Sequence, residues 1–189
     1  MCDLVYREPT INDEKIVMDY REEFVNYGIP KSVGFSLKDI KSYKEWFDDV
    51  QKKRTEKDIQ THFLVFRKQD NKLIGLLTIR HSLSNPLLLK YSGNIGYSVR
   101  PSERRKGYAT KMLETGLSVC KTLNIDNALL ICGEDNVGSK TCIENAGGVL
   151  DKKVPLDDGV IQLRYYIKTD HEKGWNMICK IIFNLIENK

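Results

Sequence analysis

The sequence lacks the features that mark secreted, membrane-spanning and zinc-binding proteins. Its five cysteines form no C-x-x-C pair and their number is odd, so we expect neither a disulfide framework nor a metal site. No run of 18 apolar residues occurs, and the first residues carry no apolar secretory segment. We therefore expect a cytoplasmic protein without a membrane partner.

The two commonest nucleotide-binding loops are also missing. A Walker loop ends in Gly-Lys-Ser/Thr, which occurs nowhere in the chain. A dinucleotide loop needs Gly-x-Gly-x-x-Gly, but Gly107 is followed at these positions by Ala109 and Met112. The net charge is only +4 and lysines are spread along the chain, so we do not expect nucleic-acid binding either.

What is present is the composition of one soluble domain. The chain has 189 residues, 41% of them hydrophobic and 30% charged. The apolar spacing predicts a strand at 4–7, a helix from a cap at 10–13 to a stop at 28–30, and a second helix at 43–50. Hairpins are expected at 62–79 around Asp70-Asn71 and at 149–167 around Asp157–Gly159, with 83–92 as a loop.

These elements predict an α/β (α+β) fold. The expected sheet is mixed and mostly antiparallel, is flanked by helices, and acquires parallel pairs in its later part. Residues 169–189 are expected to form an added amphipathic helix, because an apolar stripe runs from Trp175 to Ile186. This stripe favours packing on its own domain, and a homodimer is the alternative.

The basic stretch 104–110 has three properties of a phosphate cradle. Gly107 and Ala109 allow backbone N–H groups to approach an anion closely. An amphipathic helix begins here, so the unpaired N–H groups of its first turn face the loop. Three consecutive cations add attraction for phosphate. A strand at 95–99, stopped by Pro101, comes before the loop; a solvated turn is the alternative interpretation.

The strand, basic loop and helix resemble the GNAT superfamily of acetyl-CoA-dependent N-acetyltransferases. A second block strengthens the resemblance, since the strand at 128–132 is followed by Asn136-x-x-Ser139 and a short helix that closes at Gly147-Gly148. The chain is also similar to a bacterial subgroup of acetyltransferases in 79–81, 93–101, 147–149 and 164–167. The resemblance covers residues 4–168, which we take as one domain, and implies a splayed parallel strand pair.

The resemblance implies a site for acetyl-CoA and a primary amine as acceptor, with direct attack in a ternary complex. Backbone groups around Val99 would bind the pantetheine amide and the acetyl carbonyl. Asn136 and Ser139 would contact the pantetheine arm or only cap their helix. The pyrophosphate would be held by the loop residues Arg104, Arg105, Lys106, Gly107, Tyr108, Ala109 and Thr110.

The catalytic acid and base depart from the family pattern. Many members have a Tyr where this chain has Ile143, so Tyr97, Tyr108, a tyrosine of the last hairpin or water is the candidate acid. The strand at 93–96 carries no carboxylate, which leaves His81, Glu134, Asp135 or a chain of waters as the base. Because of these departures, a non-catalytic acyl-CoA-binding regulatory domain is the second hypothesis.

The sequence does not identify the amine. A small amine, a peptide terminus and a lysine all suit the composition, because the fold does not determine the acceptor. The irregular segments 31–42 and 83–92 are expected to line its pocket.

Overall fold

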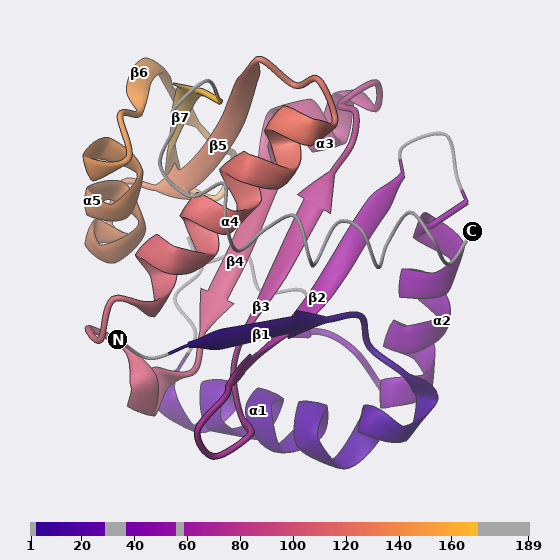
Figure 1. Cartoon of the computed structure of the whole chain (residues 1–189). Helices are drawn as coiled ribbons and strands as arrows, with labels where there is room; N and C mark the ends of the chain where they lie inside the picture. The colour runs from indigo at the N-terminus through magenta and orange to yellow at the C-terminus, as the bar shows by residue number, and fades with distance from the viewer. Residues whose placement is uncertain (1–2, 29–36, 56–58, 170–189) are drawn as a thin grey trace.

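A computed structural model of the chain describes residues 3–28, 37–55 and 59–169 (Figure 1). Its first elements are β1 (Leu4–Arg7), the 3-10 turn η1 (Ile11–Asp13), α1 (Glu14–Tyr27) and α2 (Tyr43–Lys53). Both predicted helices are confirmed. Gly28 ends α1 with a φ of 82°, and the Ser42 side chain caps α2 by accepting a hydrogen bond from the Glu45 N–H.

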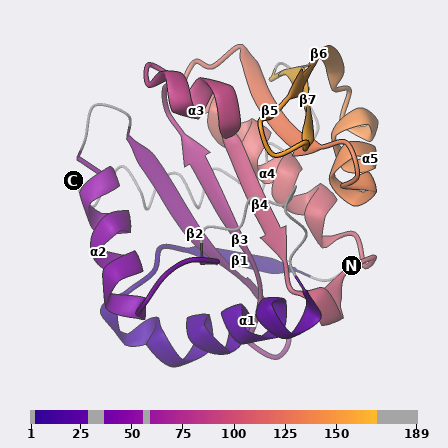
Figure 2. The same cartoon turned by 180° about the vertical axis from the view of Figure 1, so that it is seen from behind.

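The larger sheet contains β1, β2 (Gln60–Arg67), β3 (Lys72–Arg80) and β4 (Ile95–Val99), with every neighbouring pair antiparallel. The predicted turn at Asp70-Asn71 joins β2 to β3, and Asn71 adopts a left-handed φ of 53°. Alternation along β2 separates two cores, because Leu64 and Phe66 pack against α1 and α2 while Phe63 and Val65 face α4 (Tyr108–Thr122). Helices therefore cover both faces of this sheet (Figures 1 and 2).

The second sheet has the order β5-β7-β6 and is antiparallel throughout. Its elements are β5 (Asn127–Gly133), α5 (Val137–Asn145), β6 (Val149–Pro155) and β7 (Ile161–Lys168). The antiparallel sheets and flanking helices confirm the predicted fold class. The last hairpin is confirmed as well.

No parallel ladder is formed in the part of the chain that the structure describes. Strands β4 and β5 are joined by an isolated bridge between Gly93 and Leu130. Beside it, Asn94 forms hydrogen bonds with both backbone groups of Leu129. Its N–H donates to the Leu129 carbonyl at 2.7 Å, and its side chain accepts from the Leu129 N–H at 2.9 Å. A side chain thus replaces the ladder, and the two strands separate beyond it.

The expected loop at 83–92 is wrong, because it contains the helix α3 (Pro86–Tyr91). The Asn85 side chain accepts from the Leu87 N–H at 2.9 Å, and Pro86 occupies the first turn, where its missing N–H costs nothing. The predicted helix of the C-terminal extension falls on residues 170–189, outside the described residues. Among the described helices, none is long and apolar enough to cross a membrane.

Candidate functional site

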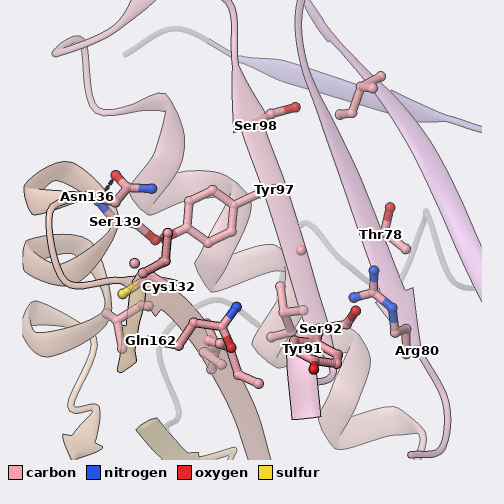
Figure 3. Close-up of a pocket in the computed structure, with 18 of the residues that line it drawn as sticks. Thr78, Arg80, Tyr91, Ser92, Tyr97, Ser98, Cys132, Asn136, Ser139 and Gln162 are labelled. Atoms are coloured by element: carbon pink, nitrogen blue, oxygen red, sulfur yellow. Dashed lines mark hydrogen bonds between the residues drawn. The ribbon is translucent and has the colours of Figure 1, made fainter. Parts of the chain in front are cut away.

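A cavity of about 460 Å³ opens where β4 and β5 separate. Its walls come from β3, β4, β5, β7 and the start of α5 (Figure 3). Thr78 and Arg80 lie on one side of β4, and Tyr97, Cys132 and Gln162 lie on the other. The cavity therefore has a wall on each side of β4, and among the described residues only the wall with Arg80 carries a charged side chain.

The loop before α4 has the geometry of an anion cradle. Gly107 is left-handed with a φ of 79° and Arg105 has a φ of 62°, which turns successive N–H groups outward. The first hydrogen bond of α4 runs from the Lys111 N–H to the Gly107 carbonyl. Within the described residues, the N–H groups of 105–110 therefore have no acceptor, and they stand at the positive end of the helix dipole.

The cations of this loop are mostly engaged inside the protein. Lys106 donates to Glu103 at 2.8 Å, and Arg104 lies over the rings of Phe24 and Tyr27 at 5.4 and 4.8 Å. Arg105 is exposed. The structure therefore supplies outward N–H groups at the cradle, with less unpaired positive charge than the sequence indicated.

Glu103 anchors this loop to the sheet. Its carboxylate accepts from Arg67 at 2.9 Å, from Lys72 at 2.8 Å and from Lys106, while its side chain is only 5% exposed. Burial raises the pKa of Glu103, but the three cationic donors lower it more, to about 2. The carboxylate is therefore ionised at neutral pH. Tyr108 belongs to the same cluster, since its hydroxyl accepts from Arg67 at 3.2 Å, so it offers the cradle only its backbone.

The second sequence block, which contains Asn136 and Ser139, lines the cavity on the same side of β4 as Tyr97 (Figure 3). Asn136 caps α5 by accepting from the Ser139 N–H at 3.2 Å, and both residues line the cavity. The Ser139 hydroxyl lies 3.1 Å from the Tyr97 hydroxyl (Figure 3). Cys142 of α5 donates to Thr110 in the first turn of α4 at 3.7 Å, which places the cradle beside this wall. The structure thus brings the two blocks together.

The Tyr97 hydroxyl is protonated at neutral pH. Burial raises its pKa far above the usual value, and the neighbouring Cys142 adds to the rise. It is therefore a neutral hydroxyl that lines the cavity and can donate a hydrogen bond there.

The three candidate bases, His81, Glu134 and Asp135, lie outside the cavity lining. Because Thr78 and Arg80 face the cavity, strand alternation turns His81 away, and its Nε2 lies 2.9 Å from the Thr61 hydroxyl on β2. Glu134 is 2.5 Å from Lys153 of β6. Val99 ends β4 just beyond the lining residue Ser98, and its carbonyl accepts from the Arg104 Nε at 3.4 Å.

Several lining residues were missed from the sequence, namely Thr78, Arg80, Tyr91, Ser92 and Gln162. Two of them belong to the segment 83–92, which was expected to line a pocket. Alternation along β3 does place Thr78 and Arg80 on one face. Only the separation of β4 from β5 reveals that this face borders a cavity.

Comparison with solved structures shows the same fold in proteins described as acetyltransferases. A mutant spermidine/spermine N-acetyltransferase from Vibrio cholerae has a TM-score of 0.61 at 16% identity, over 88% of this chain and 95% of its own. An N-acetyltransferase from Staphylococcus aureus has a TM-score of 0.63 at 15% identity, over 89% and 99%. YncA from Salmonella typhimurium, solved with its cofactor acetyl-CoA, has a TM-score of 0.60 at 12% identity, over 92% and 98%.

At the level of sequence, no curated protein matches the chain. A family model does: the acetyltransferase (GNAT) domain matches residues 3–149, more than half of the chain. The match includes the strand, the cradle and Asn136-x-x-Ser139, the features on which the resemblance was based. The chain therefore belongs to the GNAT family of acetyltransferases, as its sequence predicted.

Proposed function

We propose that the chain transfers an acetyl group from acetyl-CoA to a primary amine, by direct attack in a ternary complex. The observation that carries this proposal is the cavity between β4 and β5, lined by Asn136 and Ser139 and adjacent to the N-terminus of α4. The family membership of the chain supports acetyl-CoA as the donor.

The residues present fit the donor. Outward N–H groups at 105–110 suit a pyrophosphate, and a Cβ built on Gly107 would meet nothing within 4 Å, so the space in front of the loop is open. The pantetheine arm would pass between β4 and β5, along Val99 on one side and Asn136 and Ser139 on the other. When bound, acetyl-CoA supplies an activated thioester.

Because the thioester is already activated, the protein contributes mainly by positioning the two reactants. The amine nitrogen attacks the thioester carbonyl carbon, the C–S bond breaks, and the amine gives up a proton while the thiolate takes one up. Tyr97, which is protonated and lies beside Ser139, would donate a hydrogen bond to the departing thiolate, whose proton can come from water. A thiol has a pKa of roughly 8.5, so this hydroxyl is helpful rather than essential.

The amine proton has no carboxylate or imidazole acceptor among the described residues that line the cavity. We therefore assign it to water. For His81 or Glu134 to act as the base, either would have to reach the amine from outside this lining, and Glu134 would have to leave Lys153.

The cradle assignment is tested by Gly107→Val, with Gly107→Ala as the matched control. Both variants carry the strain of a side chain at positive φ, about 1–2 kcal/mol. Only valine adds bulk where the pyrophosphate would lie, so we expect at least tenfold weaker binding of coenzyme A relative to the alanine variant, measured by calorimetry. Equal affinities of the two variants would remove the cradle.

Turnover separates an enzyme from a binding domain. Release of free thiol from acetyl-CoA is measured over a panel of amines. We expect release that depends on the amine. Tight binding of acetyl-CoA without thiol release on any amine would support the acyl-CoA-binding regulatory domain instead.

A further inference from the structure

Arg80 brings a positive charge to the cavity without a negative partner. Its guanidinium lies over Gly96 of β4, where a Cβ would meet Nη1 at 3.4 Å and Nη2 at 3.7 Å. Nη1 donates to the Gly93 carbonyl at 3.2 Å, while the buried Nε has no hydrogen-bond partner. The missing side chain of Gly96 thus lets the guanidinium lie against β4, on the side that Thr78 also occupies (Figure 3).

No carboxylate compensates this charge within the described residues. Asp and Glu are absent from the cavity lining, and Arg80 is the one charged residue in it. Burial alone lowers the pKa of Arg80 to about 10, so the group stays charged at neutral pH. Arg80 is partly buried, and a charge withdrawn from water without a partner is costly, so a bound anion would reduce that cost.

The groups around Arg80 are neutral and polar. His62 on β2 lies behind Thr78, whose hydroxyl is 3.1 Å from His62 Nδ1. Burial, followed by the charges of Arg80 and Lys53, lowers the pKa of His62 to about 4, so it is uncharged at neutral pH. Gln162 from β7 lines the other wall with an unpartnered Oε1. Arginine's planar fork binds a carboxylate or a phosphate in bidentate geometry, and the carboxylate is the smaller of the two anions.

We propose that the amine acceptor carries a carboxylate, which Arg80 binds, so that the acceptor is a small amino acid. This inference rests on the proposed acetyl transfer. Gly96 precedes Ser98 and Val99 by two and three residues, so the guanidinium lies about 7–10 Å from the end of β4, where the acetyl group would lie. A carboxylate held at roughly 2.8 Å from the guanidinium leaves room for an amine a few bonds away to reach that end.

The test compares each amino acid with its own carboxamide as acceptor for the full chain. We expect kcat/KM at least tenfold higher for the acids than for the carboxamides. O-phosphoethanolamine is included as a further acceptor, to compare kcat/KM for an amine that carries a phosphate. Arg80→Gln is expected to abolish the preference while leaving the affinity for acetyl-CoA unchanged. Arg80→Lys keeps the charge but loses the fork, so it should raise KM for the acid more than it lowers kcat.

Arg164→Gln is the matched control, because Arg164 is a buried arginine that lies outside the cavity lining and is 3.6 Å from Asp151. It should keep the preference. Turnover of acids and carboxamides at equal rates, or of the phosphate-bearing amine alone, would overturn the carboxylate while leaving acetyl transfer intact.

A binding measurement makes the inference independent of turnover. With coenzyme A present, N-acetyl amino acids and their amides are titrated by calorimetry against the wild type and Arg80→Gln. We expect the acids to bind at least tenfold more tightly, and only to the wild type. Equal binding of acids and amides would refute the role of Arg80 even if no amine were acetylated.

Discussion

Replacing Glu103 with glutamine should loosen the loop that forms the cradle. The substitution keeps the size of the side chain but removes the negative charge shared by Arg67, Lys72 and Lys106. These cations come from β2, β3 and the loop itself, so the ionised carboxylate ties the cradle to the sheet. We expect both the stability and the affinity for coenzyme A to fall.

The magnitude follows from the pKa of Glu103. Its folded value of about 2 lies below the ordinary value of 4.5. A difference of this size corresponds to about 3 kcal/mol of stability. Because the folded pKa is the lower one, this stability is fully present above pH 4.5 and is lost as the pH falls toward 2. For a chain of this size, about 3 kcal/mol lowers Tm by roughly 6–12 °C.

The assay is urea unfolding of the wild type and Glu103→Gln at pH 7, 5, 4 and 3. The two curves should differ most at pH 7 and converge below pH 4.5. Asp70→Asn is the matched control, because Asp70 also pairs with Arg67 but is 45% exposed, so it should change stability much less than Glu103→Gln does. A gap between wild type and Glu103→Gln that is the same at every pH would refute the electrostatic argument.

Three further predictions concern His62, Gly116 and Tyr97. The folded pKa of His62, about 4, lies below its ordinary 6.5, so stability present above pH 6.5 is lost as the pH falls toward 4. His62→Gln should therefore remove about 2 kcal/mol of the stability difference between pH 7 and pH 5, measured by urea unfolding. In Gly116→Ala the new Cβ would meet Ile95 Cγ2 at 2.9 Å, and crowding of about 1–3 kcal/mol should exceed the helix-propensity gain of about 1 kcal/mol. Gly138→Ala, whose Cβ would meet no atom closer than 4.0 Å, should be as stable as the wild type or more so in the same thermal melt. Tyr97→Phe should lower kcat about tenfold without changing the affinity for acetyl-CoA, and an unchanged kcat would exclude Tyr97 as the hydrogen-bond donor to the thiolate.

The sequence predicted the elements whose signals are local. The stop at Gly28 and the turn at Asp70-Asn71 each act within a few residues, and both occur in the structure. The helix α3 was missed because it spans only six residues, and its Asn85-Pro86 start is equally typical of a turn.

The pairing of charges could not be predicted, because it depends on contacts distant in sequence. Arg67 and Glu103 are 36 residues apart, and Arg100 pairs with Glu23 across 77 residues. The basic loop was therefore interpreted as three available cations, although Lys106 and Arg104 have partners within the fold. Arg80 was recognised as part of a family resemblance, but its position in the cavity required the tertiary structure.

These pairings separate the roles of charge on the two sides of the cavity. At the cradle, Glu103 neutralises part of the positive charge, so the N–H groups of 105–110 are the main feature offered to a pyrophosphate. At Arg80 the opposite holds, because the charge is partly buried, no described acid lines the cavity, and Gly96 makes room for the guanidinium. Backbone N–H groups would then bind acetyl-CoA, the donor that the family shares. The uncompensated side chain of Arg80 would select the acceptor. We therefore expect replacement of Arg80 to change which amine is acetylated. Replacement of Glu103 should instead lower stability and the affinity for coenzyme A, whichever amine is used.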